Sequence, residues 1–202
     1  AGKRLARKLE EYRNLDPWVL AVPAGGVPVG IEVASALRCH FDLIVVRKLH
    51  IPWNREAGFG SVTSEGDVFY NESLLNRLNL SDEEIEEQVE HEKKRTKMRM
   101  EKFRGGKPMP DLRGETVILV DDGIASGFSM LAAVRSVQKR SPKKLIVAVP
   151  TGSESSVQRV SEEADKLFCL NIRSRRRFAV AEAYEDWKDL SDDEIVKLLK
   201  GF

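Results

Sequence analysis

VILVDDGIASGFSM, from Val117 to Met130, is the stretch on which the fold assignment of this chain depends. Apolar residues run into two adjacent carboxylates, Asp121 and Asp122, and a series of small residues then leads to Ser129. The apolar run predicts a buried strand, and a helix can follow it, but neither element explains the acidic pair and the small residues between them. Adjacent carboxylates repel each other, so a core strand has no need of them at its end. The pair therefore indicates a ligand that uses it.

The composition is that of an ordinary soluble globular protein. The chain has 202 residues, 42% hydrophobic and 32% charged, which is enough for one sizeable core. Its net charge of +1 argues against nucleic-acid binding through a general positive field. The two cysteines, Cys39 and Cys169, form no CxxC pair, which argues against a zinc site and favours a reducing compartment. Because the sequence has no membrane-spanning apolar run and no signal peptide, we expect a cytoplasmic protein without a membrane segment.

Short apolar runs alternate with helical patterns along the chain. The runs lack polar alternation, as in strands of a parallel sheet that helices cover on both faces. We therefore expect an α/β fold with a mainly parallel central sheet flanked by helices. The expected strands are residues 18–22, 42–46, 116–120, 144–149 and 167–172, and the expected helices are residues 27–37, 127–139 and 153–164.

A long insertion, residues 49–110, separates the second and third expected strands. Its first part, LHIPWNREAGFGSVTSEGDVFYN, mixes Gly, Pro and short β-like runs, which predicts a mobile loop and a hairpin. Its second part, residues 81–103, is strongly charged and begins with a capping box formed by Ser81 and Glu84. Few apolar side chains interrupt the charge, which favours a solvated helix with one thin packing stripe over a coiled-coil partner site. They are Ile85, Val89, Met100 and Phe103.

The loop that follows the acidic pair is suited to a phosphate. Ligands of a parallel sheet bind beyond the carboxyl ends of its strands, where loops lead into helix N-termini. Amide N–H groups at a helix start attract anions, and the hydroxyls of Ser126 and Ser129 add donors. Gly123 and Gly127 let the backbone approach the anion closely. The carboxylates would accept hydrogen bonds from hydroxyl groups of the same ligand, so a sugar phosphate satisfies both parts of the site.

This stretch resembles the phosphoribosyl pyrophosphate (PRPP) motif of the type I phosphoribosyltransferases. That motif is an apolar strand, two acidic residues and a small-residue loop with hydroxyl residues around a glycine, which SGFS matches. A Walker A loop would need GK[ST], and a dinucleotide fingerprint would place glycines directly after the strand. The resemblance extends over residues 18–187. It implies the type I phosphoribosyltransferase fold, with a core at residues 1–172 that includes the insertion, and a small C-terminal hood and helix at residues 173–202.

The resemblance also implies residues for each part of the substrate. In this family a loop after the first strand holds pyrophosphate, often with a non-proline cis peptide, and PAGG matches its place. Relatives often have Arg where this chain has Ala24. The implied residues are Gly123, Ile124, Ala125, Ser126, Gly127, Phe128 and Ser129 for the 5′-phosphate; Ala24, Gly25, Gly26, Arg47 and Lys48 for pyrophosphate; Asp121, Asp122 and Glu56 for catalysis; and Phe178 and Trp187 for the base.

Other residues have two interpretations each. Asn54 and Glu56 match polar positions of a mobile catalytic loop, although an exposed linker explains them equally well. The resemblance implies that Tyr184 lines or supports the base pocket. A basic cluster before the hood faces an anionic substrate group or solvent. Its members are Arg173, Arg175, Arg176 and Arg177.

The implied reaction is displacement of pyrophosphate from the anomeric carbon of PRPP by a nitrogen of a base, with a purine slightly favoured. Mg²⁺ accompanies PRPP in the family, so Asp121 or Asp122 would contact it directly or through water. Hypoxanthine–guanine enzymes have an Asp where this chain has Ala125, which weakens a 6-oxopurine preference. Any acid–base group must then come from elsewhere, and Glu56 and Asp186 are the candidates.

A second class of function remains open. A non-catalytic PRPP- or nucleotide-binding regulator on the same fold is the alternative, although no helix-turn-helix pattern supports it. A sugar-phosphate phosphatase or a PRPP synthetase would need motifs that this sequence lacks. By analogy with the family, the resemblance implies a homodimer that acts on PRPP and a small-molecule base.

Overall fold

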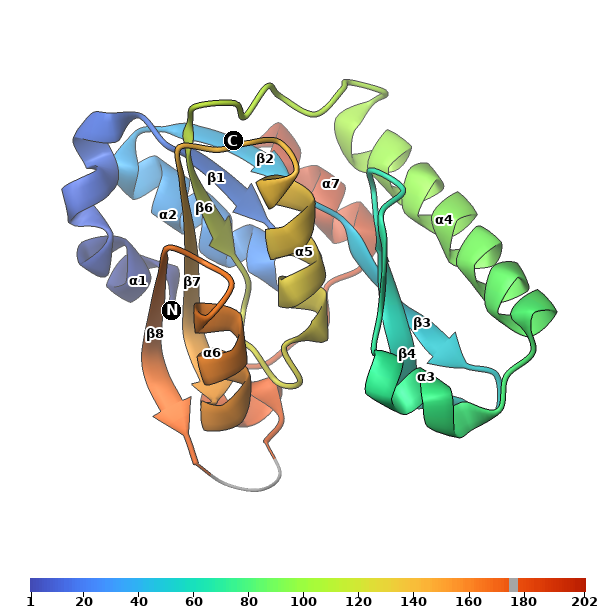
Figure 1. Ribbon diagram of the computed structural model, residues 1–202. Coiled ribbons are helices and arrows are strands. Elements are labelled where there is room, and N and C mark those ends of the chain that lie inside the picture. The colour runs from blue at the N-terminus through green and yellow to red at the C-terminus, as the bar shows by residue number, and fades with distance from the viewer. Residues whose placement is uncertain (175–177) are drawn as a thin grey trace.

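The computed structural model describes residues 1–174 and 178–202, and of residues 55–57 it describes the backbone alone. Five parallel strands form a central sheet in the order β2-β1-β6-β7-β8, and an antiparallel sheet, β3-β4-β5, is separate from it (Figure 1). The central strands are β1 (Trp18–Ala21), β2 (His40–Leu43), β6 (Thr116–Val120), β7 (Lys144–Ser153) and β8 (Lys166–Arg173). The predicted α/β fold with a parallel central sheet is confirmed.

Helices cover both faces of this sheet, as its unbroken apolar strands predict. The helices are α1 (Gly2–Lys8) and α2 (Gly26–Leu37) on one face, and α5 (Phe128–Gln138) and α6 (Glu154–Ser161) on the other. Every residue of β6 is buried. Val117 and Leu119 lie in the core with α5, whereas Ile118 and Val120 lie in the core with α2. Burial of such a side chain contributes about 1.5–3 kcal/mol, so β6 is anchored from both faces.

The expected second strand at residues 42–46 is wrong in its extent. β2 ends at Leu43, and β3 (Val46–Ile51) begins a different sheet. Between them, Ile44 donates its amide to the Ala21 carbonyl, and the Val45 carbonyl accepts from Ser64. Both crossover residues are fully buried. The apolar run therefore reflects a buried passage between two sheets and not one continuous strand.

The insertion forms its own small layer beside α5. Its elements are β3, β4 (Asn54–Thr63), β5 (Val68–Tyr70), α3 (Glu72–Leu78) and α4 (Asp82–Arg104). The two hairpins confirm the β-like part of the prediction. Ser136 of α5 donates to Asp67 at 2.9 Å and thereby ties this layer to the central one.

The charged helix α4 packs through a single stripe, as predicted. The capping box between Ser81 and Glu84 is present in both directions. Glu92 and Thr96 are buried together with three of the four predicted apolar residues, and Ile85 packs against the same core at its edge. The buried residues of α4 are Val89, Glu92, Thr96, Met100 and Phe103.

The C-terminal segment packs against both the insertion layer and the central sheet. Besides the short 3₁₀ segments at Glu10–Leu15 and Val180–Ala183, the remaining helix is α7 (Asp192–Lys200), near the C-terminus. Arg99 and Lys102 of α4 pair with Asp192 and Asp193 at 2.8 and 2.9 Å, and Ile195 is fully buried. In the part of the chain that the structure describes, no helix has the length and apolar character needed to cross a bilayer.

Candidate functional site

The site lies where the strand order of the central sheet reverses. β1 and β6 are neighbours, but the chain continues from β1 to β2 on one side and from β6 to β7 on the other. A crevice forms at such a switch point because the two following loops diverge. The loops here are residues 22–25 after β1 and residues 121–127 after β6.

The two loops touch at the acidic pair. A Cβ added to Gly25 would lie 1.6 Å from Oδ2 of Asp122, and one added to Gly26 would lie 2.8 Å from the Val120 carbonyl oxygen. Glycine is therefore required at both positions by close approach. The peptide bond between Pro23 and Ala24 is cis, as the resemblance implies for this loop.

Both carboxyl groups of the pair hold their protons more tightly than usual. Burial, followed by the negative charge of Asp122, raises the pKa of Asp121 well above its ordinary value. Burial also raises the pKa of Asp122 to about 6. One oxygen of Asp121 accepts from the Asp122 amide at 2.8 Å. A diol or a cation that binds here would favour the charged forms and lower these pKa values.

The small-residue loop presents unpaired amide groups. The hydroxyls of Ser153 and Ser156 donate to the Ala125 carbonyl at 2.9 and 2.7 Å, and Arg159 donates to the Ser126 carbonyl at 3.3 Å. These bonds fix the carbonyl side of the loop against α6. Among the described residues, no acceptor pairs with the amide N–H groups of residues 125–129. With Gly127 at a φ of 82°, the arrangement is a nest for an anion at the start of α5.

A cavity of about 720 Å³ adjoins this loop. It combines hydroxyls, two guanidinium groups and two aromatic rings, and Glu154 is the one acidic residue among its described lining residues. The residues that line it are Ala125, Ser126, Phe128, Ser153, Glu154, Ser155, Ser156, Arg159, Arg173, Ser174 and Phe178. Phe178, expected to stack on a base, thus lies in the same cavity as the loop.

The C-terminal segment supports the acidic pair through the backbone of the loop. The Tyr184 hydroxyl donates to the backbone carbonyl of Asp122 at 2.6 Å. A Cβ on Gly123 would meet Val180 at 2.8 Å, so the two segments pack closely. Burial, then the charges of the two acids, raises the pKa of Tyr184, which keeps its hydroxyl a donor. Trp187 packs against Tyr184 at a ring distance of 5.3 Å, and it is not one of the described residues that line the cavity.

The structure does not bring Arg47 to the acidic pair. Arg47 and Lys48 lie inside β3, not at the end of a central strand as expected. The Arg47 guanidinium pairs with Glu92, whose side chain is 2% exposed. The Lys48 side chain crosses Gly58, where an added Cβ would lie 2.2 Å from it. Sequence analysis missed Glu92, although its place three residues after Val89 and four before Thr96 puts it in the packing stripe.

The other expected residues are Asn54, Glu56, Asp186 and the basic cluster before the hood. The Glu56 side chain and residues Arg175, Arg176 and Arg177 lie outside the described residues. Asn54 begins β4, and Asp186 is exposed in the C-terminal segment, between Tyr184 and α7. Sequence analysis also missed the hydroxyls of Ser153 and Ser156; their position at the carboxyl end of β7 is the signal that places them beside the loop.

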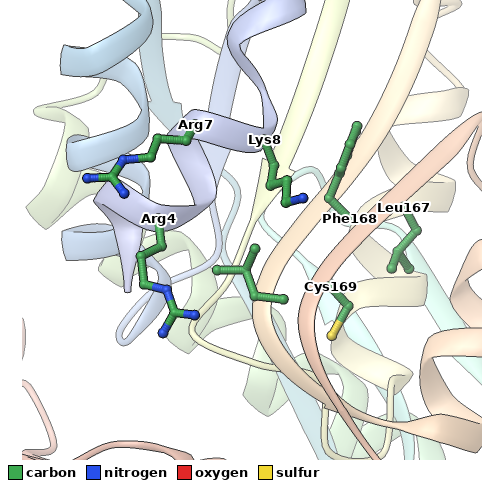
Figure 2. A pocket seen from close by; sticks show the side chains of 7 residues that line it. Arg4, Arg7, Lys8, Leu167, Phe168 and Cys169 are labelled. Carbon is green, nitrogen blue, oxygen red and sulfur yellow. The ribbon is translucent and has the colours of Figure 1, made fainter.

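A second cavity, of about 560 Å³, shares no residue with this site. Figure 2 shows Arg4, Arg7 and Lys8 extending from α1, with Phe168 and Cys169 on β8. Basic side chains in the last turn of a helix stabilise its C-terminal end, which explains Arg7 and Lys8. We therefore assign this cavity no part in the site.

Three similarities to known proteins bear on the site. The family profile described as "Phosphoribosyl transferase domain" matches residues 1–187. Two proteins named "Putative phosphoribosyl transferase", from Mycobacterium tuberculosis strains CDC 1551 and H37Rv, are each 34% identical over 199 residues. Those alignments cover 98% of this chain and 45% of each relative, so the chain spans about half the length of the curated relatives it matches. The crystal structure of the protein TT1426 from Thermus thermophilus matches with a TM-score of 0.80 and 32% identity, covering 98% of this chain and 93% of that one.

Proposed function

This chain belongs to the phosphoribosyl transferase family, and we propose that it is an enzyme that transfers the 5-phosphoribosyl group of PRPP to a nitrogen of a heterocyclic base. Pyrophosphate is the second product. The observation that carries the proposal is the row of unpaired amides at residues 125–129 beside two half-buried carboxylates. A ligand needs both a phosphate ester and a diol to satisfy them, and PRPP has both.

Each part of PRPP has a place in this proposal. The 5′-phosphate accepts from the loop amides and from the hydroxyls of Ser126 and Ser129, at the positive end of α5. The ribose hydroxyls donate to Asp121 and Asp122. The pyrophosphate lies over residues 24–26, as the family resemblance implies for this loop. Arg47 and Lys48 would supply positive charge there, and Arg47 would have to exchange its contact with Glu92 to do so.

The chemistry is a displacement at the anomeric carbon. The bond from this carbon to the pyrophosphate oxygen breaks, and a bond from the acceptor nitrogen forms. The electron pair leaves with pyrophosphate, and the proton on the nitrogen leaves to a base, for which Glu56 and Asp186 remain the candidates. Positive charge develops on the ribose during this step, so Asp121 and Asp122 stabilise it by their charge as well as by hydrogen bonds.

The acidic pair fits a role in holding Mg²⁺. Among the described residues, no cluster of three or more His, Cys, Asp or Glu side chains forms a metal site. Mg²⁺ commonly keeps several waters and binds through one or two carboxylates plus substrate phosphates. Asp121 and Asp122 would therefore hold it directly or through water, and the ion would neutralise the leaving pyrophosphate.

A double substitution tests the site. Asp121→Asn with Asp122→Asn removes both charges that accept the diol, so PRPP affinity should fall by about 100-fold or more, as for lost charge-assisted bonds. Glu86→Gln, on the exposed surface of α4, is the control for loss of charge. Calorimetric titration with PRPP and Mg²⁺ measures the affinity, and circular dichroism checks the fold. Unchanged affinity in a folded double variant would show that the site is misplaced.

A turnover assay separates an enzyme from a regulator. The protein is incubated with PRPP, Mg²⁺ and a panel of heterocyclic bases that includes purines, and pyrophosphate release is followed. The proposal expects release that depends on at least one base. Tight PRPP binding without release for any base would instead support a non-catalytic sensor.

A further inference from the structure

The last strand of the central sheet has an open edge. Among the described strands, β8 pairs with β7 alone, and it keeps one register with β7 along residues 166–173, which we call the β8 edge. An edge strand leaves backbone N–H and C=O groups unpaired, and proteins usually block such an edge with charges, proline or a bulge. Between Lys166 and Arg173, β8 has neither a charged residue nor a proline. The β8 edge can therefore accept a further strand.

The β8 edge also exposes apolar side chains on both faces of the sheet. Phe168 and Leu170 are partly buried at the margin of the core that contains α1. Leu167 and Cys169 lie in the same way at the margin of the core that contains α5. Ile172, on the same face as Leu170, is 54% exposed. A strand added beside β8 would bury this apolar surface and satisfy the open backbone groups as well.

Three cations of α1 lie beside the β8 edge (Figure 2). Arg4, Arg7 and Lys8 line the cavity of about 560 Å³ together with residues 167–170. Their spacing places them on one face of the helix. No carboxylate of a described residue pairs with any of them, and none of the described residues that line the cavity is acidic. The helix end accounts for Arg7 and Lys8 but leaves Arg4 unexplained.

This charge selects the kind of strand that fits the edge. Antiparallel pairing of β8 with a second copy of the chain would place both copies of α1 on the same face of the joined sheet. The cations of the two helices would then face each other, and like charges across an interface oppose association. An acidic strand would instead supply the counter-charges that the cations of α1 lack.

We propose that the β8 edge is a docking site for an extended acidic segment of a partner protein, which joins the five-stranded central sheet as a further strand. Side chains of a strand alternate between its two faces. Acidic residues at every second position would therefore lie beside the cations of α1, and the apolar residues between them would cover Leu167 and Cys169. The proposal does not rest on the proposed function, because this cavity shares no described residue with the one beside the loop after β6.

A peptide probe tests the docking site. The probe is as long as β8, eight residues, with alternating glutamate and valine, uncharged ends and a fluorescent dye. At low salt it should bind at least about tenfold more tightly than two control peptides, as fluorescence anisotropy measures. The first control has lysine in place of glutamate. The second has proline in place of a central valine, because proline has no N–H for the strand ladder.

Hydrogen exchange identifies the strand that pairs with the probe. A saturating amount of the probe should slow amide exchange in residues 166–173, because a bound strand protects the amides that it pairs with. Exchange in β2, the strand at the other edge of the sheet, should not change.

Neutralising variants identify the cations responsible. The triple variant replaces the three cations of α1: Arg4→Gln, Arg7→Gln and Lys8→Gln. It should weaken binding of the probe by about tenfold or more, as expected for the loss of three exposed ion pairs. The control removes the same charge from exposed positions of the insertion: Arg77→Gln, Lys94→Gln and Lys97→Gln. Arg4→Gln alone, which leaves the last turn of α1 intact, should weaken binding by about two- to fivefold and decides the question if the triple variant unfolds.

Other outcomes overturn the proposal, each for a different reason. Absence of probe binding would show that the edge does not accept an acidic strand. Binding that persists with the proline peptide, or that leaves exchange in residues 166–173 unchanged, would mean a contact without strand pairing. Equal affinity for a single-stranded oligonucleotide of the same charge would make this a general surface for polyanions. A dimer whose formation slows exchange in residues 166–173 would assign the edge to a second copy of the chain.

Discussion

At the scale of single residues, the site requires glycine at two positions where no side chain would fit. Gly25 and Gly26 allow the loop after β1 to rest on the acidic pair, since a Cβ at either position would collide with it or with β6. Asp122 in turn lies under this loop, and burial raises its pKa to about 6. The packing of this loop on Asp122 therefore explains both the need for glycine and the raised pKa of the carboxyl group.

A single methyl group at Gly25 should disrupt the contact. In Gly25→Ala the new Cβ would lie 1.6 Å from the Asp122 carboxylate, so the loop or the acid must move. We expect a loss of about 1–3 kcal/mol of stability, typical of overpacking, and at least a tenfold loss of PRPP affinity. Urea unfolding and calorimetric titration measure the two effects. Gly201→Ala is the control, because a Cβ there meets nothing closer than 3.6 Å; similar results for both variants would contradict the account.

The pKa of Asp122 predicts how stability depends on pH. In the folded protein this pKa is about 6, against 3.8 for the ordinary value, so the folded state binds the proton more tightly than the unfolded chain. The free protein should therefore lose stability from this group as the pH rises from about 4 to about 6, by at most about 3 kcal/mol. PRPP affinity should rise over the same range, because the diol binds the charged acid.

Asp122→Asn isolates this effect. The variant should match the wild-type protein near pH 4 and become the more stable of the two above pH 6, since it has no charge to bury. Thermal unfolding of the ligand-free proteins across this range gives the comparison, with Glu86→Gln as the control. Parallel stability profiles for wild type and Asp122→Asn would show that burial of Asp122 carries no such cost.

At the scale of elements, α4 shows how a charged helix is attached through few contacts. Its packing stripe is mostly apolar, but Glu92 lies within it and pairs with Arg47 of β3 and with Arg95. The Glu92 side chain is 2% exposed and that of Arg47 is 20% exposed. A buried pair of this kind fixes the register of two elements, and removing one partner leaves the other uncompensated.

Glu92→Gln should therefore destabilise the protein well beyond the effect of a surface charge. The amide keeps the shape of the side chain but leaves the Arg47 guanidinium without its counter-charge. We expect a loss of about 2–4 kcal/mol, somewhat below fully buried pairs because Arg47 is partly exposed. Glu90→Gln, which breaks the exposed pair with Lys93 on the same helix, should cost less than about 1 kcal/mol. Equal losses in urea unfolding would show that the Arg47 contact does not support the layer.

At the scale of the whole molecule, segments far apart in the chain meet at the acidic pair. The loop after β1 lies against Asp122 from one side, and Tyr184 reaches its carbonyl from the C-terminal segment. Ion pairs also join α7 to α4 and thereby connect the C-terminal segment to the insertion layer. Figure 1 shows the central sheet with the insertion layer beside it and α7 reaching toward α4. The site is thus assembled from the first, middle and last parts of the chain.

Tyr184→Phe tests this long-range support. The variant loses the hydroxyl that donates to the Asp122 carbonyl at 2.6 Å, and no other part of the ring changes. We expect a loss of about 1 kcal/mol of stability, the usual value for one hydrogen bond, together with a higher KM for PRPP. Thermal unfolding and pyrophosphate release provide the measurements. Tyr70→Phe in the insertion is the control; if it has the same effect, the hydroxyl of Tyr184 does not position the pair.

The sequence by itself determined the central strands β1, β6, β7 and β8, the loop after β6 and the stripe of α4. These features are encoded locally, because unbroken apolar runs require burial on both faces and small residues permit the backbone of an anion nest. The family resemblance identified the place of the cis peptide between Pro23 and Ala24.

Only the tertiary structure decided which groups meet. A buried strand and a buried crossover both require apolar residues, so the sequence of residues 42–46 could not distinguish between them. Likewise, Arg47 follows a strand in the sequence, but its partner Glu92 lies 45 residues away, and Tyr184 lies 62 residues from Asp122. Such pairings depend on how layers pack, because burial and charge at each position arise from neighbours that are distant along the chain.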